Sequence, residues 1–87
     1  MYELLIRPFE MGTPKEAAVK PLEEAAEVYA AWQECNWLDS GDALDNLADE
    51  LADVIQAACN LADRYDIDLQ AAMMRCEDRN RARGRYK

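Results

Sequence analysis

Residues 43–64 read ALDNLADELADVIQAACNLADR, and this stretch decides the fold. At about 100° per residue its apolar side chains fall on one stripe of an α-helix. That pattern predicts an amphipathic helix from about Ala43 to Arg64. Glu50 and Asp53 lie along one edge of the stripe, and side chains three apart on a helix are neighbours. The stripe consists of Leu44, Leu47, Leu51, Val54, Ile55, Ala58 and Ala62.

A second stretch, ending near Cys35, repeats this arrangement. Its carboxylates, Glu24 and Glu27, have the same spacing pattern and the same angular offset from an apolar stripe. If the two stripes pack together, the four carboxylates converge. The second stripe is formed by Leu22, Ala25, Val28, Tyr29 and Trp32.

Four like charges gathered beside a core repel one another and lose solvation. A divalent cation relieves both costs, and hard oxygen ligands without His or Cys suit Mg²⁺, with Mn²⁺ as the alternative. The competing interpretation is a solvated acidic face, because this short spacing also arises on the surface of any acidic helical protein.

Capping signals set the other helix boundaries. Thr13-Pro14-Lys15-Glu16 reads as a capping box that starts the first helix. Pro21 has no amide proton, so we expect a break or a kink near Lys20.

The connecting loops follow from turn residues. Residues 36–42 are expected to form the first loop, with Ser40 or Asp42 capping the second helix. Asp66 or Asp68 is expected to cap a third helix from about Leu69 to Ala82, which Gly84 would end. This predicts an all-α fold with three main helices and a four-helix-bundle type of core that oligomerisation completes.

Composition narrows the classes of function. The chain has 87 residues, a formal net charge of −8, no His and three Cys without a C-x-x-C spacing. We expect a single domain over residues 1–87, with an N-terminal arm at 1–12 and a basic tail at 84–87. The charge argues against a nucleic-acid partner, and the absence of a signal peptide or a long apolar run predicts no membrane partner and a cytoplasmic location.

The two tryptophans have different expected environments. Trp32 lies within an apolar stripe and is expected in the core. Trp37 is expected in the loop, where it either packs or stacks on a nucleobase.

Three ordered motifs resemble the MazG-type all-α nucleoside triphosphate pyrophosphohydrolases, close to their short single-domain members. They cover about residues 20–85. The motifs are Lys20-Pro-Leu-Glu-Glu24-Ala-Ala-Glu27-Val, Asp-Glu50-Leu-Ala-Asp53-Val-Ile with the later Ile67-Asp68-Leu turn, and Arg79-Asn80-x-x-Arg83-Gly84.

The resemblance implies a hydrolase that acts on acid anhydrides. It would cleave a nucleoside triphosphate between the α and β phosphates, giving the monophosphate and pyrophosphate for nucleotide-pool housekeeping. The implied metal-binding and catalytic residues are Glu24, Glu27, Glu50 and Asp53, and the implied substrate-binding residues are Lys20, Arg79, Asn80, Arg83 and Trp37.

Some family members carry Lys where this chain has Arg79, and Arg keeps the charge while adding a bidentate fork. Lys20 has a second interpretation as an i,i+4 partner of Glu24. The implied assembly is a homodimer or a homotetramer. The alternative function is a non-catalytic oligomeric helical module with an acidic face, with or without a stabilising metal.

Overall fold

A computed structural model contains three α-helices among the residues that it describes: α1 (Pro14–Leu38), α2 (Gly41–Arg64) and α3 (Leu69–Ala82). The structure describes residues 2–38 and 41–86, and of residues 36–38 it describes the backbone alone. Among these residues there is no strand, which confirms the predicted all-α fold. An arm without helix or strand precedes α1.

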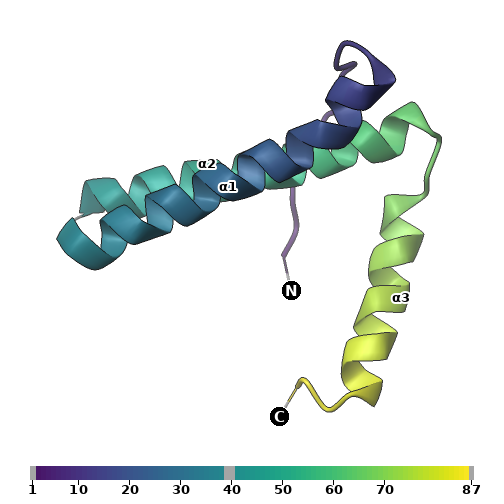
Figure 1. The fold of residues 1–87 in the computed structure, drawn as a ribbon. Helices are drawn as coiled ribbons and strands as arrows, with labels where there is room; N and C mark the ends of the chain where they lie inside the picture. The colour runs from purple at the N-terminus through teal and green to yellow at the C-terminus, as the bar shows by residue number, and fades with distance from the viewer. Residues whose placement is uncertain (1, 39–40, 87) are drawn as a thin grey trace.

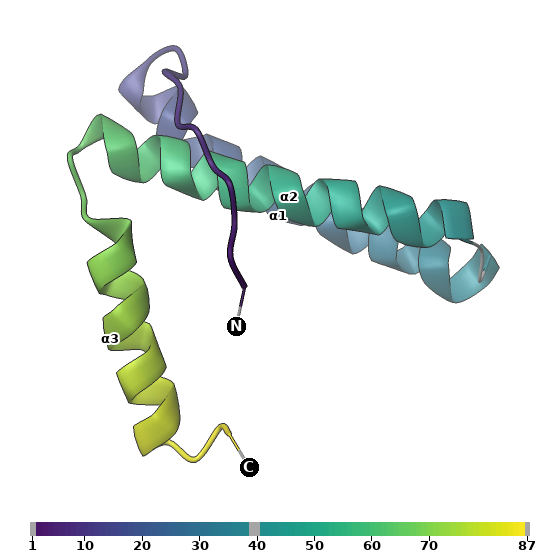
Figure 2. The same ribbon diagram turned by 180° about the vertical axis from the view of Figure 1, so that it is seen from behind.

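Helices α1 and α2 form an antiparallel hairpin and lie side by side (Figures 1 and 2). The buried and half-buried positions recur at alternating spacings of three and four residues, which is the spacing of helices that pack at a shallow crossing angle. Ala17, Ala31, Ala43 and Ala57 are the buried apolar members, and their small side chains allow close approach of the two backbones. The full contact line is Ala17, Pro21, Glu24, Val28, Ala31 and Cys35 in α1, and Ala43, Leu47, Glu50, Val54, Ala57 and Leu61 in α2.

This contact line lies one residue before much of the predicted one. Leu22, Tyr29 and Trp32, expected to pack against the second helix, are 72%, 59% and 47% exposed. The predicted burial of Trp32 is therefore wrong within one chain. Alanine occupies buried positions of the contact line because bulky side chains there would hold the helices apart. We call the exposed set the apolar face; it consists of Leu22, Tyr29, Trp32, Leu44, Leu51 and Ile55.

The two halves of the apolar face lie on the same side of the hairpin. In both helices the exposed positions are about a quarter turn from the contact line, in the direction of increasing residue number. Because the helices are right-handed and antiparallel, equal offsets of this kind fall on one side of the pair. Tyr29 and Trp32 stack there with their ring centroids 5.7 Å apart.

Helix α3 projects away from the hairpin, and none of its residues is buried (Figures 1 and 2). Its start is as predicted, because the Asp68 carboxylate accepts a hydrogen bond from the Ala71 N–H at 2.9 Å. Gly84 ends it with a φ of +69°, a conformation that costs glycine little. The Arg85 N–H then donates to the Asn80 carbonyl, which closes the last turn.

The start of α1 also follows its capping signal. The Glu16 N–H donates to the Thr13 hydroxyl oxygen at 3.2 Å, and that hydroxyl donates to Glu16 Oε1 at 3.0 Å. The carboxylate therefore binds the hydroxyl of the capping residue, a variant of the predicted reciprocal box. Pro14 occupies the first helical position, where a missing N–H costs nothing.

Three predicted boundaries are wrong. α1 passes through Pro21 without a break, so the Ala17 carbonyl lacks its usual helical partner, and packing along α2 offsets that loss. α1 also continues to Leu38, which places the backbone of Trp37 in the helix instead of a loop. α2 starts at Gly41, so Asp42 lies inside its first turn and does not cap it. Ser40 and the side chain of Trp37 lie outside the described residues.

Candidate metal centre

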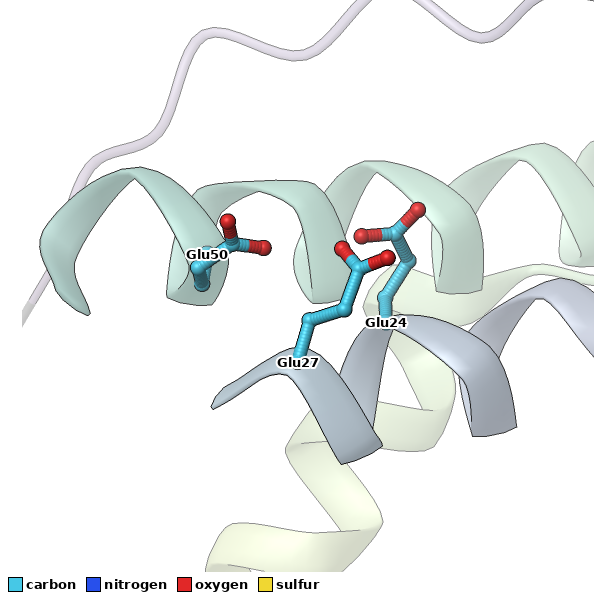
Figure 3. A group of neighbouring side chains, drawn as sticks. All are labelled: Glu24, Glu27 and Glu50. Carbon is cyan, nitrogen blue, oxygen red and sulfur yellow. The ribbon is translucent and has the colours of Figure 1, made fainter. Parts of the chain in front are cut away.

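Three glutamates meet where α1 and α2 run side by side (Figure 3). Glu24 and Glu27 come from α1 and Glu50 comes from α2. One oxygen of each lies within 4.8 Å of the other two. Glu24 is buried at 7% exposure, Glu50 is half-buried and Glu27 is exposed. Three of the four carboxylates that the sequence predicted to converge therefore do so.

Helix geometry explains which carboxylates meet. Glu24 and Glu50 occupy the contact line itself, and Glu27 follows Glu24 by one turn on the side away from the apolar face. Asp53 follows Glu50 by one turn but is exposed and stands outside the group. Its angular offset from the contact line equals that of Glu27, but its side chain is one methylene shorter.

Two oxygens in this group lack a hydrogen-bonding partner. Glu24 Oε2 and Glu50 Oε2 are both buried and unpaired. The other Glu24 oxygen, Oε1, lies 3.2 Å from Lys20 Nζ. Burying an unpaired carboxylate oxygen is expensive, and native structures leave few such atoms without a ligand, water or proton.

The charges perturb one another. Hydrogen bonding with Glu50, and then with Glu24, raises the pKa of Glu27 above its usual 4.5. Glu27 therefore holds a proton more tightly beside these two carboxylates than it would in water. Across the site, the hydrogen bond and ion pair with Glu24 raise the pKa of Lys20 above 10.5. The group therefore attracts positive charge, either as a proton or as a cation.

A divalent cation fits this donor set. It would supply the missing partner of both orphan oxygens, and carboxylates are the hard ligands that Mg²⁺, Mn²⁺ and Ca²⁺ prefer. Two ligands on opposite sides of Mg²⁺ stand about 4.2 Å apart, whereas those on Ca²⁺ stand about 5 Å apart. The three oxygens lie within 4.8 Å of one another, which is close enough for either ion once the exposed Glu27 side chain rotates.

The remaining predicted site residues divide by helix. Lys20 lies at the glutamates, in the i,i+4 pair that the sequence also suggested. Arg79, Asn80 and Arg83 belong to the far end of α3, and the single chain does not bring them to the glutamates (Figure 1). The Asn80 amide instead donates to Cys76 Sγ at 3.6 Å.

Sequence reasoning missed one polar cluster. Asn60 is 5% exposed, and its side-chain oxygen accepts from the Phe9 N–H and from Gln56 Nε2, both at 2.9 Å. The available signal was the polar Asn60 in an otherwise apolar turn of the helix, because a buried amide needs partners. The cluster fixes the N-terminal arm on α2 and touches none of the three glutamates.

Comparison with protein-family models, with curated proteins and with solved structures gave no match for this chain. Among the described residues, no helix combines the length and the apolar character needed to cross a membrane.

Proposed function

We propose that the chain is a Mg²⁺-dependent nucleoside triphosphate pyrophosphohydrolase, which cleaves between the α and β phosphates. The observation that carries the proposal is the pair of buried, unpaired oxygens of Glu24 and Glu50, with Glu27 beside them at the helix contact. The resemblance to MazG-type enzymes, whose metal-binding pattern corresponds to these glutamates and to Asp53, supports it.

The three glutamates have distinct roles in this proposal. Glu24 and Glu50 hold the ion through their buried oxygens, and Lys20 fixes the orientation of the Glu24 carboxylate. Glu27 is the exposed member, so its free oxygen can orient a water molecule for in-line attack on the α phosphorus. Bound Mg²⁺ would supply neutralisation of the triphosphate and a lower pKa for a coordinated water.

Triphosphate binding requires a second chain. Arg79, Asn80 and Arg83 offer the donors that suit phosphate oxygens, but α3 carries them away from its own glutamates. We propose that another copy brings its α3 to the site, in a homodimer or a pair of such dimers. The core supports this assembly, since its buried apolar residues are five alanines and, within the described residues, no large side chain is fully buried.

A pyrophosphate-release screen tests the activity. The chain is incubated with Mg²⁺ and a panel of ribo- and deoxyribonucleoside triphosphates, and both products are identified. We expect a nucleoside monophosphate and pyrophosphate in equal amounts, with no release in EDTA. Release of orthophosphate instead, or no product from any nucleotide, would contradict the proposal.

A second function, a non-catalytic oligomeric helical module, is favoured by the exposed apolar face. Soluble proteins rarely leave large apolar side chains grouped on one side without a partner. In that case a divalent ion would stabilise the acidic contact between α1 and α2 without chemistry. Thermal stabilisation by Mg²⁺ together with no turnover across the nucleotide panel would select this alternative.

A further inference from the structure

The N-terminal arm is fastened to α2 by its backbone. Gln56 Nε2 donates to the Arg7 carbonyl at 2.9 Å, and the Phe9 N–H donates to Asn60 Oδ1 at 2.9 Å. Gln56 also donates to Asn60, so the two α2 side chains brace each other. The arm crosses the outer side of α2 at these fasteners and then leaves the hairpin (Figure 2).

Beyond the fasteners the arm is mostly apolar, and of residues 2–6 only Ile6 is half-buried. Tyr2 and Leu4 are exposed, and Leu5 is 105% exposed, which means that no part of its own chain covers it. Burying a leucine side chain stabilises a folded state, so a fixed arm that presents leucine to water leaves this free energy unused.

The arm and α3 extend from the hairpin toward the same side in both views (Figures 1 and 2). Seen at the three glutamates, α3 passes behind α1 (Figure 3). Glu27 and the apolar face occupy opposite sides of the hairpin by the helix offsets given above. The apolar face therefore lies on the side of the hairpin toward which the arm and α3 extend, and α3 carries the exposed Met73 and Met74.

The exposed area of the chain shows how much surface this arrangement leaves to cover. A compact monomer of 9.9 kDa exposes about 5,200 Å² by the usual size scaling, whereas this chain exposes 7257 Å². The excess is about 2,000 Å² per chain, which is the share of each subunit in an obligate homodimer interface. A transient partner would typically cover less than half of that area.

The partner that covers this surface must accompany every folded copy, because the missing buried area belongs to the chain's own core. A second copy meets this condition, and a two-fold axis lets each apolar face cover the other. We propose that residues 2–6 form a clamp that closes over the hairpin of a second copy, whose apolar face packs against the first. This inference rests on the proposed homo-oligomer and adds the element that holds it together.

Sedimentation equilibrium of the full chain, without Mg²⁺ or nucleotide, tests the clamp. The variants are Leu5→Asp at the arm tip, Gln56→Ala at a fastener, and Gln33→Glu as a control that adds the same charge to an exposed outward position of α1. We expect the wild type to be dimeric at micromolar concentration. Leu5→Asp should raise the dimer dissociation constant by about tenfold or more, because a two-fold dimer contains the change twice. Gln56→Ala should raise it less, and Gln33→Glu should leave it within about twofold.

Each outcome of this experiment either supports or refutes the proposed clamp. A Leu5→Asp dimer as tight as wild type would overturn it while leaving the dimer intact, and a monomeric wild type would overturn both. Because Leu5 touches nothing in its own chain, loss of helical circular dichroism in Leu5→Asp that recovers at high protein concentration supports the clamp. Loss that no concentration restores would refute it. Catalysis is not measured, so failure of the proposed enzymatic activity leaves this test unaffected.

Discussion

Lys20 Nζ lies 3.2 Å from Glu24 Oε1, so the charge of Lys20 reaches one oxygen of the buried carboxylate while Oε2 on the same carboxylate remains unpaired. Within α1, Lys20 therefore balances the charge on one oxygen of Glu24. The other oxygen still needs a partner such as a ligand, which is why the Lys20–Glu24 pair is informative about the site.

Replacing Lys20 by Met tests this division. The variant keeps most of the side-chain bulk and removes the ion pair, so the melting temperature in EDTA should fall, and the increase on adding Mg²⁺ should become larger than in wild type. Lys15→Met, at the exposed second position of α1, is the control and should change neither value much. Equal Mg²⁺ responses in both variants would argue against an ion at Glu24.

The pH dependence of stability follows from Glu27. Its pKa is raised in the folded chain by hydrogen bonding with Glu50 and then with Glu24, so the folded state binds this proton more tightly than the unfolded state. The resulting contribution to stability is full below pH 4.5 and is lost as the pH rises through the raised pKa. In EDTA, thermal melts at a series of pH values should show this loss in wild type and not in Glu27→Gln. Glu34→Gln, exposed on α1, should behave like wild type.

Close packing of the hairpin gives a prediction about the fold alone. Ala31 is 3% exposed on the contact line, so Ala31→Leu should force the helices apart and lower the free energy of unfolding by roughly 1–3 kcal/mol. Ala30→Leu, at the exposed neighbouring position, should cost little. Urea unfolding of both variants at one protein concentration measures the difference. If Ala31→Leu were as stable as Ala30→Leu, the contact line would have to lie elsewhere on α1.

Arg79 separates substrate binding from metal binding. Because Arg79→Ala removes a proposed triphosphate contact and leaves the glutamates intact, KM should rise about tenfold or more while the Mg²⁺ response of the melting temperature stays unchanged. Arg81→Ala is the matched control, since Arg81 already pairs with Glu77 at 2.9 Å. If both variants raised KM equally, a general effect of charge on α3 would explain the result.

Local signals in the sequence predicted the helices well. Thr13, Asp68 and Gly84 act through neighbours within a few residues, so their capping roles could be inferred without knowing the fold. The break predicted from Pro21 was wrong because the packing of α1 along α2 outweighs one lost hydrogen bond.

The contact line was harder to predict than the helices. Leu, Tyr and Trp dominate an apolar pattern by size, yet Ala31 and Ala57 make the close approach, and the large residues face outward. This shift by one position puts Glu24 and Glu50 at the contact itself instead of its edge. Periodicity gives the angle between positions but not which face a second helix occupies. It also gives Asp53 and Glu27 equal offsets, so it could not show that only Glu27 joins the group.

Steady-state pyrophosphate release by wild type and Glu50→Gln tests the central claim most directly. The substitution conserves shape and removes one ligand charge, so the folded state should survive, and its melting temperature in EDTA should hold or rise as repulsion is relieved. Asp49→Asn, the exposed neighbour, is the control and should keep turnover close to wild type. Metal stabilisation of phosphoryl charge is worth several kcal/mol, and each ~1.4 kcal/mol is tenfold in rate. The account predicts that Glu50→Gln loses turnover by orders of magnitude, whereas wild-type turnover in folded Glu50→Gln would contradict it.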